Sequence, residues 1–226
     1  MNMNMFDQFA SPEILLMPVS LVAMLVPIMF IRPNNSILGN RMSTMLNWFF
    51  KTVLLNMIHQ LSPIGQKWSR FLVSLLVFIL LSNLLGLLPY TFTTTSQLSM
   101  NMAMAIPMWM ATVVTGMTTK TSSTLAHMLP EGSPTPLIPF MIMIETISLF
   151  MRPIALGVRL TANITAGHLL MTMISSATLN FFNVYNTLCI TMTTLLFLLT
   201  LLEMAVACIQ AYVFVLLVTL YLQENT

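Results

Sequence analysis

The side chains of this sequence that could do chemistry are few, and several lie within apolar segments. The stretch 159–170, RLTANITAGHLL, places Arg159, Asn163 and His168 among apolar and small residues. An Arg at the centre of a membrane costs roughly 2.5–3.5 kcal/mol on insertion scales, so such a cation indicates a functional site. Because Arg keeps its proton, we expect Arg159 to act as a fixed positive charge. Helical spacing puts small residues and an amide on its face, where another helix could approach closely: Ala155, Ala162, Asn163 and Ala166.

Titratable and amide side chains also occur at corresponding positions of two long apolar segments, 139–180 and 187–223. In an antiparallel pair of helices with equal rise, residues at one level have position numbers that sum to twice that of the turn centre. Three pairs place this centre near residue 185, within the polar stretch FFNVYN (181–186): His168 with Glu203, Arg159 with Gln210, and Glu145 with Glu224. We therefore expect a helical hairpin with titratable groups toward each side and the fixed cation between them.

These levels predict one proton route from each side of a membrane. A carboxylate and an imidazole can accept and release a proton, whereas Arg cannot. The outer route then contains His168 and Glu203. The inner route contains Glu145 and Glu224, and Arg159 separates the two. Such a block is useful only if a mobile carboxylate on a partner carries the proton past the Arg.

Structural roles are the alternative for the same residues. Arg159 is then a member of an ion pair, and His168 is an interhelical hydrogen-bond donor. Arg152 lies two turns from Glu145 on nearly the same face and would pair with it through an intervening group. Glu224, near the end of the chain, would be a solvated side chain.

Composition places the chain in a membrane. Charged residues make up 6% and hydrophobic residues 57%, with a mean hydropathy of +0.88, whereas about a quarter of the residues in soluble domains are charged. The net charge of +2, without a basic run and interleaved aromatic residues, argues against nucleic acid as a partner. Cys189 and Cys208 lack metal-ligand spacing and are interpreted as packing residues, and we expect neither a metal site nor a cofactor.

The expected fold is an all-α integral membrane protein, a single membrane domain over residues 1–226 with five membrane-embedded segments and an interfacial amphipathic helix. The predicted segments are span one over 14–31, the interfacial helix over 38–62, span two over 71–90, span three over 98–117, and long helices over 139–180 and 187–223 that form a tilted hairpin. The first long helix would measure roughly 60 Å, about twice the hydrocarbon core, so it is either tilted or broken at Pro153 and Gly157.

The basic residues predict the orientation. Five of the eight fall between spans one and two: Arg32, Arg41, Lys51, Lys67 and Arg70. By the positive-inside rule this side faces the inner compartment, and Lys120 returns the chain to it after span three. With five spans, the N-terminus is then outside and the C-terminus inside.

Six segments carry a resemblance to a known family. They are NLLGLLPY (83–90), SQLSMNMAMAIP (96–107), PLIPF (136–140), ETISLF (145–150), RLTANITAGHLL (159–170) and EMAVACIQAYVF (203–214). Together they resemble subunit a of the F-type ATP synthases, in its mitochondrial form, over most of the chain after Arg70. The 23 methionines also look like those of an organelle-encoded protein.

The resemblance implies a stator subunit that forms two offset half-channels against a rotating ring of c subunits. Proton translocation through them couples the proton gradient to ATP synthesis, with no ATP-synthesising or ATP-hydrolysing site on this chain. The implied partners are the c-ring, other F0 membrane and peripheral-stalk subunits, and the lipid bilayer. The implied location is the mitochondrial inner membrane, with the N-terminus in the intermembrane space and the C-terminus in the matrix.

The resemblance also implies roles for single residues. They are Arg159 facing the ring carboxylate, Asn163 and Gln210 as its polar companions, His168 and Glu203 in the intermembrane-space route, and Glu145 in the matrix route. No role is assigned to Arg152 or Tyr90.

Two other classes of protein are alternatives. A secondary transporter would typically show paired halves with broken helices, and the sequence contains no internal repeat. A scaffolding subunit of a respiratory membrane complex would use its intramembrane charges as structural pairs. Dependence on partners separates these classes, because a transporter works alone in liposomes and a stator works only with its ring.

Overall fold

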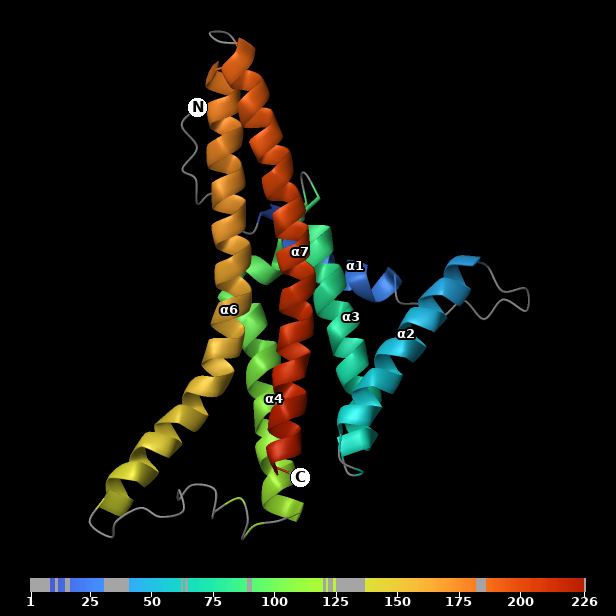
Figure 1. Cartoon of the computed structure of the whole chain (residues 1–226), viewed down its shortest axis with the longest axis vertical. Coiled ribbons are helices and arrows are strands. Elements are labelled where there is room, and N and C mark those ends of the chain that lie inside the picture. Colours follow the sequence, from blue (N-terminus) through green and yellow to red (C-terminus); the bar gives the residue numbers. More distant parts are fainter. Residues whose placement is uncertain are drawn as a thin grey trace. The chain divides into compact units, whose positions relative to one another are not determined.

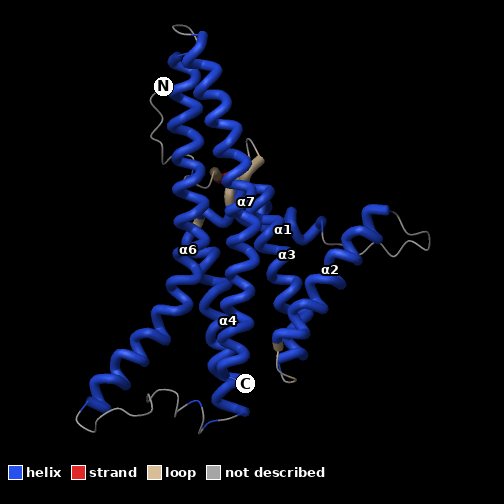
Figure 2. Tube along the Cα trace, in the orientation of Figure 1, coloured by secondary structure: helices blue, strands red, loops and turns tan. Residues whose placement is uncertain are grey.

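Helices make up almost all of the structure that can be described (Figure 2). The computed structural model describes residues 9–10, 12–14, 17–30, 41–61, 63, 65–88, 91–119, 121, 124, 137–181 and 186–225. In chain order the elements are β1 (Glu13–Ile14), β2 (Met17–Pro18), α1 (Val19–Phe30), α2 (Arg41–Gln60), the 3-10 helix η2 (Gly65–Trp68), α3 (Ser69–Gly86), the 3-10 helix η3 (Thr94–Ser96), α4 (Leu98–Thr119), α6 (Ile138–Phe181) and α7 (Asn186–Asn225).

Four of the described helices are long and apolar enough to cross a membrane. They cover Gly65–Gly86, Leu98–Thr119, Ile138–Asn180 and Leu188–Asn225. These helices correspond to predicted spans two and three and to the two predicted long helices. The prediction of a helical membrane protein is therefore confirmed, while the exact layout of five spans stays a prediction.

The N-terminal segment differs from the predicted span over 14–31. Its helix α1 has only 12 residues, Val19–Phe30, or roughly 18 Å, which is short of the hydrocarbon thickness. The residues before it form a small antiparallel pair of strands, in which Glu13 lies opposite Pro18. Proline disfavours helical geometry in the residue before it, which explains a helix that begins only after Pro18. Residues 31–40, including Leu38 at the start of the predicted interfacial helix, lie outside the described residues.

Helix α2 covers most of the predicted interfacial helix. It carries large apolar side chains that are well exposed, among them Met45, Trp48 and Phe49, and also the exposed cation Lys51. A surface of this kind fits a helix that contacts lipid. The position of α2 relative to a membrane stays a prediction.

Helix α6 runs without interruption through Pro153 and Gly157. The alternative in which these residues break the long helix is therefore wrong. With 44 residues, α6 measures roughly 66 Å, so the alternative of a strong tilt remains as the prediction.

Serine and threonine hydroxyls inside the helices are satisfied locally. Thr165 donates to the carbonyl of Thr161 at 2.9 Å, Thr178 to that of Ser175 at 2.6 Å, and Thr219 to that of Leu216 at 2.7 Å. In an apolar environment each hydroxyl needs such a partner. These side chains are therefore compatible with membrane helices and need no functional explanation.

The chain divides into two compact units, which we describe separately. The first combines residues 1–31, 78–100 and 159–212, and the second combines 32–77, 101–158 and 213–226. In the first unit, the later part of α6 runs beside α7 in the opposite direction (Figure 1). Its most buried side chains include Ile79, Asn83, Leu160, Ala207 and Ala211.

The second unit is held together by apolar packing and close approaches at two glycines. Its most buried side chains include Leu72, Ala105, Met108, Phe214 and Val215. A Cβ added to Gly157 would lie 2.5 Å from the Met102 sulfur, and one added to Gly116 would lie 2.9 Å from the Asn225 Cβ. Small residues of this kind let membrane helices approach closely.

Candidate functional site

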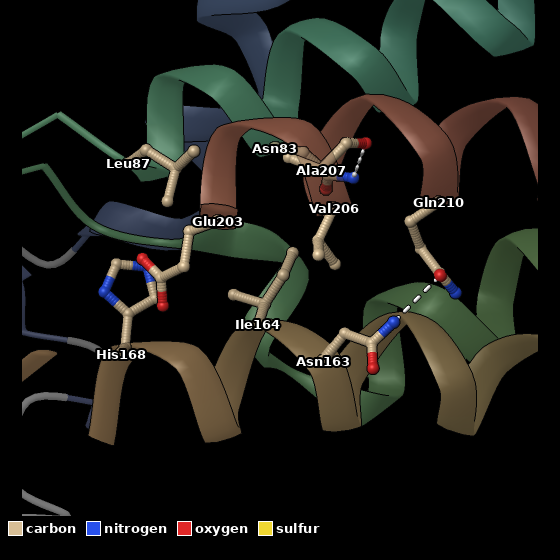
Figure 3. A pocket seen from close by; sticks show the side chains of 9 residues that line it. All are labelled: Asn83, Leu87, Asn163, Ile164, His168, Glu203, Val206, Ala207 and Gln210. Carbon is tan, nitrogen blue, oxygen red and sulfur yellow. Dashed lines mark hydrogen bonds between the residues drawn. The ribbon is translucent and has the colours of Figure 1, made fainter. Parts of the chain in front are cut away.

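The first unit contains a small cavity between α3, α6 and α7 (Figure 3). Its volume is about 30 Å³, which is room for one or two water molecules. Its lining residues are Asn83, Leu87, Asn163, Ile164, His168, Glu203, Val206, Ala207 and Gln210. Four predicted site residues from two distant segments of the sequence are therefore brought together here.

Glu203 is the acidic residue that lines the cavity, and it is buried. Only 8% of its surface is exposed, and neither carboxylate oxygen has a hydrogen-bond partner among the described residues. Its carboxylate lies directly against the backbone of Gly167, where an added Cβ would lie 2.9 Å from Cδ of Glu203. A carboxylate without partners is costly to bury, so this position needs water or a proton to satisfy it.

His168 lines the same cavity from α6. Its ring is half-buried, and Nε2 has no hydrogen-bond partner within the part of the chain that the structure describes. Figure 3 shows the imidazole and the Glu203 carboxylate on the same side of the cavity. The sequence prediction that His168 and Glu203 lie at one level of the hairpin agrees with this geometry.

Gln210 pairs with Asn163 instead of Arg159. The Nδ2 group of Asn163 donates a hydrogen bond of 2.8 Å to Oε1 of Gln210 (Figure 3). Gln210 is buried, and Asn163 lies on the more exposed side of α6. The predicted pairing of levels is therefore shifted by about one helical turn at this point.

Arg159 lies on the exposed face of α6. Ala162, Asn163 and Ala166, one and two turns further along, are exposed as well, as helical spacing predicts. Within the described residues Arg159 makes no ion pair or hydrogen bond through its guanidinium. The face therefore presents a fixed cation flanked by small side chains.

Asn83 is a site residue that the sequence reasoning did not assign. It is 2% exposed, and its Nδ2 group donates to the Ala207 carbonyl at 3.5 Å, which joins α3 to α7. Its Oδ1 atom has no partner among the described residues and belongs to the lining of the cavity. The sequence could have indicated Asn83, because it is an amide inside the apolar run of span two, and a polar side chain within a membrane segment often has a functional role.

A second cluster lies in the second unit, around Arg152. Its Nη1 donates to Oε2 of Glu224 at 3.1 Å, and its Nη2 is 3.7 Å from Oε1 of Glu145. The guanidinium also lies 5.1 Å from the centre of the Tyr221 ring. Arg152 thus forms an ion pair with each of the two acids, without the intervening group expected from the sequence, and the predicted common level of Glu145 and Glu224 stays a prediction. Glu224 is half exposed, in agreement with a solvated end, and it also has an ion-pair partner in Arg152.

The cysteines differ in their surroundings. Cys189 is buried, in agreement with a packing role, whereas Cys208 is exposed, so the packing interpretation is wrong for Cys208. Among the described residues no group of three or more His, Cys, Asp and Glu side chains could hold a metal ion.

The comparisons with known proteins all point to one family. The family model described as ATP synthase A chain matches residues 14–223. The chain is 71% identical to "ATP synthase F(0) complex subunit a" of Lycodon semicarinatus, with 100% of both chains covered. It is 56% identical to the protein of that name from Struthio camelus and 53% identical to that from Pan paniscus, again over 100% of both chains.

These likenesses extend over nearly the whole chain. They favour the proton-translocating prediction over a secondary transporter or a scaffold. They also agree with the absence of a predicted ATP site, since this subunit is a membrane component and not the catalytic one. The chain belongs to the subunit a family of the ATP synthase F(0) complex, which takes part in proton translocation.

Proposed function

We propose that this chain conducts protons through two offset half-channels against a rotating ring of c subunits. Protons enter from the intermembrane space past His168 and Glu203 and reach a ring carboxylate that faces Arg159. After rotation of the ring, they leave through a matrix route that contains Glu145. The chain thereby couples the proton gradient to ATP synthesis, in a complex with the other F0 membrane and peripheral-stalk subunits.

The cavity in the first unit carries this proposal. Its polar atoms without described partners are Asn83 Oδ1, His168 Nε2 and both carboxylate oxygens of Glu203. Most of the accessible lining of the cavity is apolar, but a cavity with room for a water molecule and two to four polar partners is a site where buried water is stable, and these four atoms are available as partners. Water between an imidazole and a carboxylate supports proton transfer between them, because both groups can accept and release a proton. The pair is therefore suited to the outer half-channel.

The exposed face around Arg159 supports a partner at this position. A cation in a membrane helix needs an opposite charge or a polar environment, and the described residues provide no acidic partner for it. Ala162 and Ala166 leave room for another helix to approach the guanidinium. A carboxylate on a ring subunit would satisfy Arg159 when deprotonated, and Arg159 would block any direct passage of protons.

The proposed polar companions of Arg159, Asn163 and Gln210, are hydrogen-bonded to each other. The bond between Asn163 and Gln210 joins α6 to α7 one turn from Arg159. Their amides can donate to and accept from water or a carboxylate without changing charge. We infer that they keep the approach to Arg159 polar without conducting protons through it.

The relatives suggest the mitochondrial inner membrane, and the charge distribution supports an orientation in it. Four helices have spanning length, and the basic residues are concentrated before α3. By the positive-inside rule, we infer that this side faces the matrix of mitochondria, with the C-terminus on the same side. An N-terminus in the intermembrane space additionally requires that residues 14–31, which include α1, cross the membrane, and we propose that they do.

Thiol labelling from the two sides of the membrane tests the two-route proposal. Glu145→Cys and Glu203→Cys are introduced singly into the assembled ATP synthase in a Cys189→Ala, Cys208→Ala background. We expect an impermeant thiol reagent to modify position 145 from the matrix side and position 203 from the intermembrane side. Leu160→Cys is the matched control, because Leu160 is 0% exposed and should react from neither side. Labelling of positions 145 and 203 from one side only would overturn the two-route arrangement.

A further inference from the structure

Arg152 is a second cation within the long helix α6, and the proposed proton routes give it no task. Its side chain is 31% exposed and meets groups from two helices: Glu145 of α6, and Tyr221 and Glu224 of α7. All of these residues belong to the second unit. Arg152 is thus the centre of the cluster that contains the acid of the proposed inner route.

The Arg152 guanidinium lies closer to Glu224 than to Glu145. Its contact with Glu224, at 3.1 Å, is a hydrogen-bonded ion pair, whereas its approach to Glu145, at 3.7 Å, is beyond hydrogen-bond distance. Tyr221 and Glu224 are one helical turn apart, so α7 presents both the ring and the carboxylate to the same cation. The ring and the carboxylate together direct Arg152 toward α7.

Among the described residues, the partners of Glu145 are therefore weak. Besides the distant guanidinium, it accepts one long hydrogen bond of 3.4 Å from the Ser148 hydroxyl. A shift of less than about 1 Å would bring Nη2 of Arg152 into direct hydrogen-bond contact with this carboxylate. A charge-assisted pair of that kind is strong and would compete with a proton for the same oxygens.

We propose that Glu224 is the counter-ion that holds Arg152 away from Glu145, so that Glu145 remains free to exchange protons. Arg152 and Glu224 are positioning residues in this arrangement, and Glu145 exchanges the proton. Glu224, predicted from the sequence as a proton-exchanging group of the inner route, thereby takes the different role of a counter-ion. The proposal rests on the proposed role of Glu145 in the inner route. It predicts that removal of Glu224 slows proton exchange only while Arg152 is present.

The test compares ATP synthesis by assembled ATP synthase in proteoliposomes, driven by an imposed pH gradient and potential and normalised to the amount of incorporated subunit. We expect Glu224→Gln to slow synthesis about threefold, within the range of interaction energies measured for contacting residues. The double variant Arg152→Gln, Glu224→Gln should be faster than Glu224→Gln alone, since the competing cation is gone. Glu224→Asp should restore most of the rate because it keeps the counter-ion.

The outcomes separate this inference from the function on which it rests. A double variant as slow as Glu224→Gln, or slower, would mean that the pair merely fastens α7 to α6, and it would overturn the counter-ion role. Failure of Glu224→Asp to restore the rate would overturn it as well. Glu145→Gln tests the proposed inner route independently: a normal rate in that variant refutes the route itself, whatever the behaviour of Glu224.

Discussion

Replacing Gly167 with Ala should disable the outer route while leaving helix α6 folded. A Cβ at this position would lie 2.9 Å from Cδ and 3.3 Å from Cγ of Glu203, and closer still to the carboxylate oxygen Oε1. Ordinary van der Waals contact begins at 3.4 Å, so Cδ alone must retreat by 3.4 − 2.9 = 0.5 Å. The carboxylate oxygen has to move further, and the acid is displaced from its place in the cavity.

The effect on stability is small compared with the effect on function. Ala is favoured over Gly in a helix interior by about 0.5–1 kcal/mol, which offsets part of an overpacking cost of typically about 1–3 kcal/mol. The subunit should therefore still assemble. A misplacement of about 1 Å in a reacting group can lower a rate about 100-fold, so we expect at least about a tenfold loss in ATP synthesis.

The assay is ATP synthesis in proteoliposomes at equal content of assembled subunit. Gly86→Ala is the matched control, because its added methyl would meet a methyl group of Thr93 at 3.1 Å and no carboxylate. A second variant, Gly167→Ala with Glu203→Asp, withdraws the acid by one methylene and should recover part of the rate. Normal synthesis by Gly167→Ala, or a loss equal to that of Gly86→Ala, would refute the placement of Glu203 against Gly167.

Three further predictions concern the same unit. Arg159→Lys should abolish coupled synthesis, because a desolvated Lys can lose its proton and an Arg cannot; synthesis at near wild-type rate would contradict the fixed-cation role. Single removals of His168 and Glu203 should each slow proton entry, and their double removal should cost much less than the sum, as expected for residues that act together; additive losses would indicate separate structural roles. Asn83→Leu removes a partner for cavity water and should slow proton entry about fivefold, equivalent to about 1 kcal/mol, at unchanged subunit content; an unchanged rate would exclude Asn83 from the route.

The helices from α3 onward could be predicted from the sequence because long uncharged segments leave few alternatives. In a membrane every backbone polar group must be paired, so apolar runs of spanning length become helices. The spacing of His168 and Glu203 about a turn near residue 185 then placed both at one level, and both line one cavity in the structure. Residues 182–185 themselves lie outside the described residues.

Other features depend on packing that no linear pattern contains. The level rule paired Gln210 with Arg159, but Gln210 bonds to Asn163, because the register of two helices is set by side-chain packing along their whole length. Asn83 comes from a third helix, and the level rule compares only two. At the N-terminus, a run of apolar residues had suitable length, yet Pro18 and the strand pair before it leave a helix of 12 residues.

Glu203 and Arg159, two charged groups of the first unit without ion pairs among the described residues, lie in different environments. Glu203 is 8% exposed and faces the cavity, so water within the protein can satisfy it. Arg159 is exposed beside Ala162 and Ala166 and has no ion pair among the described residues. The acid can be neutralised by taking up a proton, but the cation has no such escape. We therefore expect the partner of Arg159 to be an acid outside the described residues, which we propose to be the ring carboxylate, whereas the proton that reaches Glu203 can be delivered through the cavity.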